Sequence, residues 1–196
     1  MAEIKSTMEL VMERAARMGK ASNDELQQED KRKQGMKLAA DFLDGKLDNL
    51  LIALTEHDGE QQVTIRSGIV ETLLRNIFLH RDEVGKERTE QAAKGLLEIS
   101  GNAGDVSSIC AEVQHILGQY NQHREQLRQQ LEEQMRMQYE QMLAQQGGGM
   151  QADGMNIEHA LEAKINEEWS KMEAEISSQY NQALNQHKAN IRERLR

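Results

Sequence analysis

The sequence contains no proline, one cysteine, and only two Phe, three Tyr and one Trp among its 196 residues. Without proline, no residue is present that must break a helix. Few aromatic side chains argue against a thick globular core, because these side chains bury the largest apolar areas. The single thiol, Cys110, excludes a disulfide within the chain, and cysteine usage does not indicate an oxidising compartment.

Long apolar runs are also missing. No stretch approaches the ~18 apolar residues that a membrane-spanning helix needs. The first 18 residues, MAEIKSTMELVMERAARM, are charged throughout and lack the apolar centre of a secretion signal. We therefore expect a cytoplasmic protein.

The residues that are abundant form helices. Glu, Gln, Ala, Leu, Met and Arg are frequent, β-branched runs are few, and the mean hydropathy is -0.76. These features predict an all-α fold. The net charge of -9 argues against a general nucleic-acid-binding surface.

The last ten residues, HKANIRERLR, are an exception to the acidic balance, with four cations against Glu193. Cations are favoured at the C-terminal end of a helix, where the helix dipole is negative. A second interpretation is that they bind an acidic partner.

The first segment, residues 1–21, is expected to be an amphipathic helix running from about residue 3 to 18. Ile4, Met8, Val11 and Met12 lie on one face of it at helical spacing. Gly19 is expected to end this helix, and Ser22–Glu25 resembles a capping box that begins the next one.

Residues 22–104 are predicted to form a small helical bundle. The next helix should close at Gly45, and a short helix should cover about 47–54. The clearest core helix is expected over 62–81, and another helix over 86–100. The apolar stripe of the core helix comprises Ile65, Ile69, Val70, Leu73, Leu74, Ile77 and Phe78.

Residues 105–196 are predicted to form a long antiparallel helical hairpin, a coiled-coil-like arm with a glycine-rich tip at 147–156. Its first stripe begins with heptad spacing at Val106, Ile109, Val113, Ile116 and Tyr120, and continues through Leu127, Leu131, Met135, Tyr139 and Met142. The second stripe comprises Ile157, Leu161, Ile165, Trp169, Met172, Ile176, Tyr180, Leu184, His187, Ile191 and Leu195. Past His123, both stripes repeat every ~3.75 residues, and two helices that pack together must share such a period. A parallel homodimer of either helix remains an alternative.

No arrangement of residues indicates catalysis, a cofactor or a metal. Glu112 and His115 have the i, i+3 spacing of di-iron bundles, but no second Glu-x-x-His accompanies them. The triple glycine lacks the Lys-Ser/Thr of a phosphate-binding loop. Several methionines could bind a soft metal, although methionine more commonly fills helix interfaces. We therefore expect no catalytic, cofactor-binding or metal-binding residues.

The opening EIKSTMELVMERAARM, followed by DELQQEDKRKQG and FLDGKLDNLLIAL, resembles a family of small uncharacterised bacterial helical proteins. These proteins begin with Ile-Lys-Ser-Thr and Val-Met-Glu-Arg, and the resemblance covers about residues 2–100. It implies a helical fold and carries no assigned activity, so it transfers no functional residues.

The sequence thus predicts a non-enzymatic scaffold or adaptor that binds a protein partner or a second copy of itself. The expected interaction residues are Leu127, Leu131, Tyr139, Ile165, Trp169, Ile176 and Tyr180 on the arm, with Ile4, Met8, Val11 and Met12 on the first helix. The alternative is a protein that binds membrane surfaces reversibly through its first helix. The mixed charges of that helix make a membrane surface the less favoured partner.

Overall fold

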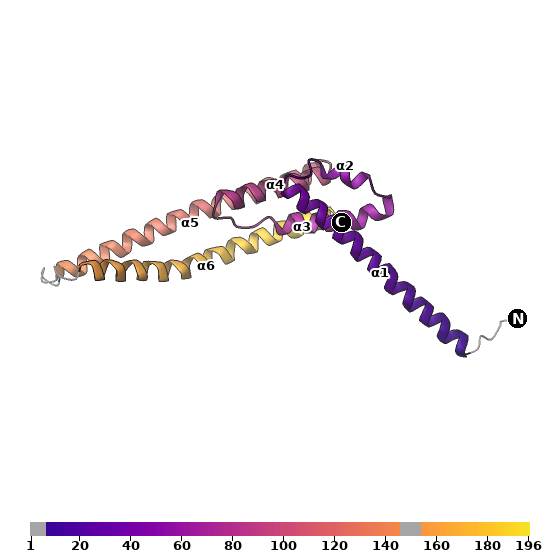
Figure 1. Ribbon diagram of the computed structural model, residues 1–196. Coiled ribbons are helices and arrows are strands. Elements are labelled where there is room, and N and C mark those ends of the chain that lie inside the picture. The colour runs from indigo at the N-terminus through magenta and orange to yellow at the C-terminus, as the bar shows by residue number, and fades with distance from the viewer. Residues whose placement is uncertain (1–6, 146–153) are drawn as a thin grey trace. The chain divides into compact units, whose positions relative to one another are not determined.

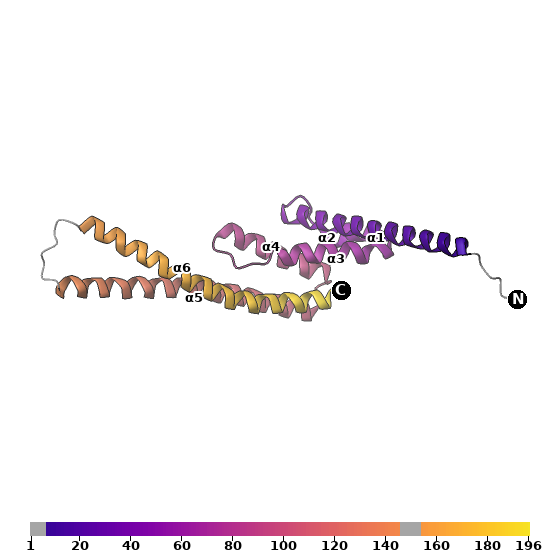
Figure 2. The same ribbon diagram turned by 90° about the horizontal axis from the view of Figure 1, so that it is seen from below.

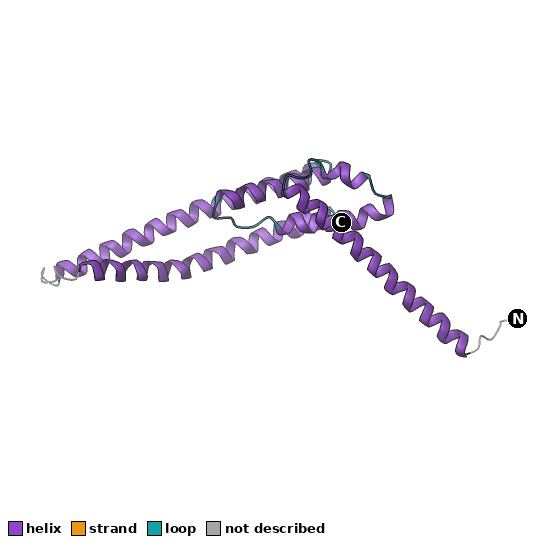
Figure 3. Cartoon of the chain, in the orientation of Figure 1, coloured by secondary structure: helices purple, strands orange, loops and turns teal. Residues whose placement is uncertain are grey.

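The computed structural model describes residues 7–145 and 154–196, and the described part of the chain contains six helices and no strand (Figures 1 and 3). The all-α prediction is confirmed. The helices are α1 Thr7–Leu43, α2 Leu50–Thr55, α3 Gly59–Arg75, α4 Glu83–Ile99, α5 Gly104–Gln145 and α6 Gly154–Arg194. Most of the glycine-rich tip predicted at 147–156 lies outside the described residues.

Helix α1 is continuous, so the prediction that a helix ends at Gly19 and a new one begins at Ser22–Glu25 is wrong. A single internal glycine costs a helix only about 1 kcal/mol relative to alanine. Unlike proline, glycine keeps its backbone N–H, so no helical hydrogen bond is lost. With helix-forming residues on both sides, the glycine is accommodated.

The end of α1 matches the prediction. Gly45 takes a left-handed conformation (φ +71°), and its N–H donates to the Phe42 carbonyl at 3.1 Å. The N–H of Lys46 donates to the Asp41 carbonyl at 2.8 Å, which completes a Schellman motif. Helix α4 ends in a similar way at Gly101 (φ +65°).

Helix α3 is shorter than the predicted helix over 62–81. Its last turn is closed by Asn76, whose side-chain amide donates to the Thr72 carbonyl at 2.8 Å. Ile77 and Phe78 belong to the stripe predicted for this helix, but both residues follow the end of α3. Ile77 is nevertheless fully buried, whereas the Phe78 side chain is 38% exposed.

The chain divides into two compact units. The first unit contains the described residues up to Ile77, together with Arg88–Val106 and Arg192–Arg196. The second unit contains Phe78–Glu87 and Ser107–Ile191. In the first unit, the predicted α3 stripe supplies much of the core. The fully buried side chains there include Ala39, Phe42, Leu50, Ile65, Ile69, Leu73, Leu74, Ala92 and Leu96.

Within the first unit, the backbones of α1 and α3 touch at two glycines. A Cβ atom on Gly35 would lie 2.0 Å from the Ile65 carbonyl oxygen. A Cβ atom on Gly68 would lie 2.2 Å from the Arg32 carbonyl oxygen. Both atoms that block a side chain are backbone atoms, so the helices can cross this closely only because these two positions carry no side chain.

We expect Gly35→Ala and Gly68→Ala each to lower the free energy of unfolding by about 2 kcal/mol, because the added methyl group forces α1 and α3 apart. Gly118→Ala in α5 is the matched control, since nothing lies within 4 Å of its added Cβ. That change should raise the free energy of unfolding by about 0.5–1 kcal/mol through helix propensity. Urea unfolding measures all three, and stabilisation by Gly35→Ala would contradict the contact.

In the second unit, the predicted stripe of α6 is correct. Each described member from Leu161 onward is buried or half-buried. The heptad seam expected at the start of α5 is partly wrong, because Cys110 and Leu117 are buried while Ile109 and Ile116 are only half-buried. Cys110 is a buried thiol, and burial raises its pKa to about 11.

Candidate interaction surface

Helices α5 and α6 run antiparallel and contact each other through side chains along their length (Figures 1 and 2). As residue numbers rise along α5, the numbers of their partners on α6 fall. The contacts include Glu112 Oε2 with His187 Nδ1 (3.2 Å), the hydroxyls of Tyr120 and Ser177 (3.0 Å), and Arg128 Nη2 with Asn166 Oδ1 (3.1 Å). The order of these pairs is that expected of a hairpin.

Four of the predicted arm residues form one apolar cluster. Leu131, Ile165 and Trp169 are 9%, 6% and 7% exposed and pack together, with Leu127 against them. Met135, Leu161 and Met172 extend the cluster as partly buried neighbours. Contacts within one chain are therefore enough to bury Trp169.

The ring of Trp169 also lies close to two guanidinium groups. Arg124 Cζ lies 5.8 Å and Arg128 Cζ 5.4 Å from the ring centroid, within the range of cation–π contacts. Arg124 Nε donates to Glu173 Oε1 at 2.7 Å, and Arg128 Nε donates to Glu132 Oε1 at 2.6 Å. These carboxylates hold the two arginines in place.

The polar contacts around Trp169 were not predicted from sequence. Arg124 and Arg128 lie four residues apart on one helix face, and Arg128 and Glu132 repeat that spacing. This pattern could have indicated a charged border along the seam. Its partner across the seam, Glu173, could not be identified from local spacing.

The aromatic and aliphatic residues farther along α6 also face α5. The rings of Tyr180 and Tyr120 meet edge to face, with centroids 5.5 Å apart and planes at 63°. Ile176 is 4% exposed. Together with Leu127 it lines a small cavity of about 180 Å³. The predicted positions Ile176 and Tyr180 thus lie on the same seam as Trp169.

Near the glycine segment the seam opens. The first turns of α6, drawn in orange in Figure 2, diverge from α5. A groove of about 250 Å³, which we call the tip groove, lies between the two helices there. Its lining residues are Met135, Gln138, Tyr139, Met142, Ala160, Leu161 and Lys164. Tyr139 belongs to this groove and not to the buried cluster, and the Met142 side chain is 49% exposed.

The predicted first-helix residues lie on α1. The side chains of Met8 and Met12 are 69% and 64% exposed. Val11 is a residue of helix α1, and Ile4 lies outside the described residues. Met8 and Met12 of α1 are therefore exposed, whereas most of the arm residues are covered.

The described ranges contain neither a cluster of metal-binding side chains nor a membrane-spanning helix. No three His, Cys, Asp or Glu side chains there are grouped closely enough to hold a metal ion. Glu112, considered above for its spacing from His115, instead approaches His187. Of the described helices, none is both long and apolar enough to cross a bilayer.

A family model matches residues 52–193, which is well over half of the chain. The chain belongs to the family of unknown function DUF6657. The expectation of an uncharacterised helical family is confirmed. The DUF6657 match includes α3, α4, α5 and almost all of α6, whereas α1 precedes it. No curated protein and no solved structure matches the chain.

We expect Trp169→Ala in this DUF6657 chain to lower the free energy of unfolding by about 3 kcal/mol, because it removes the largest side chain of the seam cluster. Trp169→Phe keeps an apolar ring and should cost less. The wild-type tryptophan should also show blue-shifted emission and weak quenching by acrylamide. Unchanged melting of Trp169→Ala, or strong quenching in the wild type, would contradict the buried seam.

Proposed function

We propose that the protein is a non-enzymatic helical scaffold or adaptor that binds a protein, or a second copy of itself, through apolar faces of its long helices. The observation that carries this proposal is the tip groove. It is lined by methionine, tyrosine and leucine side chains and lies between two helices. Methionine is common at adaptable binding surfaces because its side chain is flexible and polarisable.

The position of the tip groove between two helices favours a helical ligand. Two diverging helices with apolar residues at their inner edges form a seat for a third helix, which binds through residues spaced at i, i+3 and i+4. Gln138 and Lys164 supply polar groups at the border of the groove. An apolar floor with a polar border is the usual composition of a protein interface.

The exposed methionines of α1 support the same class of function. Met8, Met12 and Leu26 are 69%, 64% and 59% exposed on one long helix. An exposed apolar side chain is common by itself, but Met8 and Met12 recur at helical spacing, which is typical of a docking face. Such a helix is a suitable ligand for the tip groove of a second copy.

The test compares two methionines of α5 with nearly equal exposure. Met142 lines the tip groove and is 49% exposed, while Met137 is 51% exposed and does not line it. If copies associate through the groove, Met142→Lys should weaken association about tenfold, because one buried methionine contributes roughly 1.5–3 kcal/mol. Met137→Lys should have little effect. Sedimentation over a concentration series measures both.

If the wild type is monomeric throughout that series, the partner is a different protein. A photocrosslinker at position 142 should then couple to one protein in the source cell, and a photocrosslinker at position 137 should not. Equal coupling from the two positions, or none from either, would contradict the proposal.

The second candidate function is reversible binding to a membrane surface through α1, which the exposure of Met8 and Met12 favours. Flotation with mixed phosphatidylcholine and phosphatidylglycerol vesicles tests it. On this function the wild type floats with the vesicles, and Met8→Glu with Met12→Glu abolishes flotation, since each glutamate places a charge in the lipid-facing stripe. Wild-type protein that stays at the bottom of the gradient would eliminate this candidate.

A further inference from the structure

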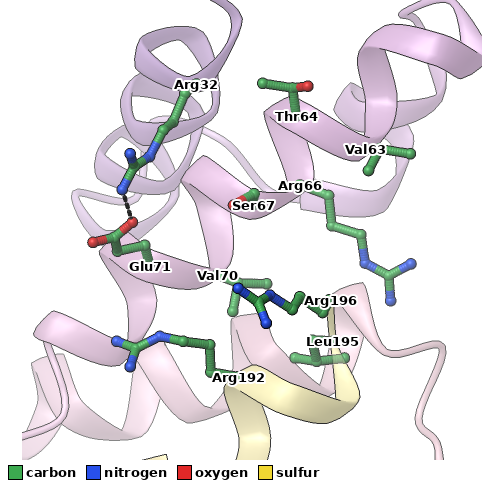
Figure 4. A pocket seen from close by; sticks show the side chains of 10 residues that line it. All are labelled: Arg32, Val63, Thr64, Arg66, Ser67, Val70, Glu71, Arg192, Leu195 and Arg196. Carbon is green, nitrogen blue, oxygen red and sulfur yellow. Dashed lines mark hydrogen bonds and ion pairs between the residues drawn. The ribbon is translucent and has the colours of Figure 1, made fainter. Parts of the chain in front are cut away.

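A cavity of about 470 Å³ in the first unit is lined by four arginines, and Glu71 is the one acidic side chain among its described lining residues (Figure 4). The arginines come from segments that are far apart in sequence: Arg32 from α1, Arg66 from α3, Arg192 from the last turn of α6, and Arg196 from the two residues that follow α6. The remaining lining residues are Val63, Thr64, Ser67, Val70, Glu71 and Leu195. We refer to it as the arginine cavity.

The one acidic side chain among the described residues of the arginine cavity is already paired. Glu71 Oε2 accepts from Arg32, and Glu71 Oε1 accepts from Arg75 Nη2 at 2.8 Å. The Arg32 guanidinium, its strongest partner, lowers the pKa of Glu71, so this carboxyl group stays ionised and bound to the two arginines. Glu71 is thus occupied and does not neutralise the other cations of the cavity.

The side chains of Arg192 and Arg196 find no acceptor among the residues that the structure describes. In the described part of the chain, neither side chain makes an ion pair or a hydrogen bond, whereas the intervening Arg194 pairs with Asp105. Arg66 donates one Nη2 bond to the Ile99 carbonyl at 3.1 Å. A guanidinium carries five N–H donors, so unused donors remain on each cavity arginine.

The helix dipole explains cations at the end of α6 but does not explain the whole cavity. It accounts for Arg192 and Arg194 in the last turn. It does not account for Arg32 and Arg66, which come from other helices to line the same space. Like charges that line one cavity repel each other, so a bound anion would stabilise this arrangement.

The donor set favours an oxyanion. Besides four guanidinium groups, the lining contains the hydroxyls of Thr64 and Ser67, while Val63, Val70 and Leu195 supply apolar wall. The donors come from separate stretches of the chain, and several separate donors suit the tetrahedral oxygens of phosphate better than the two coplanar oxygens of a carboxylate. None of the described residues that line the cavity is aromatic, so they offer no stacking surface for a nucleobase.

We propose that the arginine cavity binds a small multivalent phosphate compound, of pyrophosphate size or larger, through Arg32, Arg66, Arg192 and Arg196. This site is independent of the tip groove and of the scaffold function proposed above. The negative charge of the bound compound offsets the repulsion among the four arginines. Binding therefore stabilises the first unit.

Calorimetric titration of the full chain, tagged at its N-terminal side, with pyrophosphate tests the site. We expect saturable binding that weakens as salt is added, because salt screens the attraction between charges. Arg192→Gln and Arg196→Gln should each weaken binding about tenfold, the effect of losing one charge-assisted hydrogen bond. Arg194→Gln is the control: it removes an equal charge from the same turn but does not line the cavity, so it should leave affinity within about twofold.

A second variant tests the cavity without removing an arginine. Ser67→Asp places a carboxylate among the lining residues, where it should compete with the ligand and abolish pyrophosphate binding. Because Ser67 is exposed, the variant should remain folded, which thermal melting without ligand checks. Retained pyrophosphate binding by this folded variant would overturn the proposal.

Three further results would also overturn it. One is the absence of saturable pyrophosphate binding at millimolar concentration. Another is equal weakening by Arg194→Gln and Arg196→Gln, which would indicate attraction to the general charge of the chain end. The third is tighter binding of citrate or of an acidic peptide than of pyrophosphate, which would assign the arginines to carboxylates or to a protein partner.

Discussion

The mutual covering of the apolar stripes on α5 and α6 is the interaction on which the second unit depends. Each of these helices has about forty residues, most of them polar or charged, and extends for about 60 Å at 1.5 Å per residue. A mostly polar helix has little stability in isolation. Helices α5 and α6 therefore remain helical mainly because each buries an apolar face. Leu131, Ile165, Trp169 and Ile176 supply that burial, at roughly 1.5–3 kcal/mol for each side chain.

The polar features of the seam follow from this pairing. Once Trp169 is held between the helices, Arg124 and Arg128 can cover its ring while bonding to carboxylates. Where the helices diverge toward the glycine segment, the stripe is no longer covered by its partner helix and becomes the tip groove. The same apolar residues therefore stabilise one part of the helix pair and are available for binding in another. This continuity is the physical basis for the proposed scaffold function.

The sequence predicted the fold class and the α6 stripe because both depend on local pattern. Spacing of apolar residues along α6 identified the buried face, and Gly45 identified the end of α1, since a left-handed residue is needed there. The predicted break at Gly19 and the extension of α3 to residue 81 were wrong. At Gly19 a helix-breaking propensity was outweighed by its neighbours, and at Asn76 a side-chain cap ended the helix before its apolar pattern did.

What the sequence could not predict depends on contacts between distant residues. Gly35 and Gly68 are two helical glycines at which the backbones of α1 and α3 meet, and no spacing along the chain links these positions. Arg32 and Arg66 lie on different helices and line one cavity with Arg192 and Arg196, which are more than a hundred residues away in sequence. Neither relationship can be inferred from the spacing of residues along the sequence.

The pairing of α5 with α6 within one chain is tested most directly by a distance between two spin labels at exposed positions, Gln126 on α5 and Ser170 on α6. Both replaced residues are exposed, and Cys110→Ala removes the native thiol. Labelled chains are diluted with an excess of unlabelled chains, so only distances within one chain are measured. Intrachain pairing predicts a narrow distribution near about 20 Å, set by an interaxial separation of 8–10 Å plus the label arms. If the two helices of one chain do not pair, the distribution should be broad or centred beyond about 40 Å. Either result would contradict intrachain pairing.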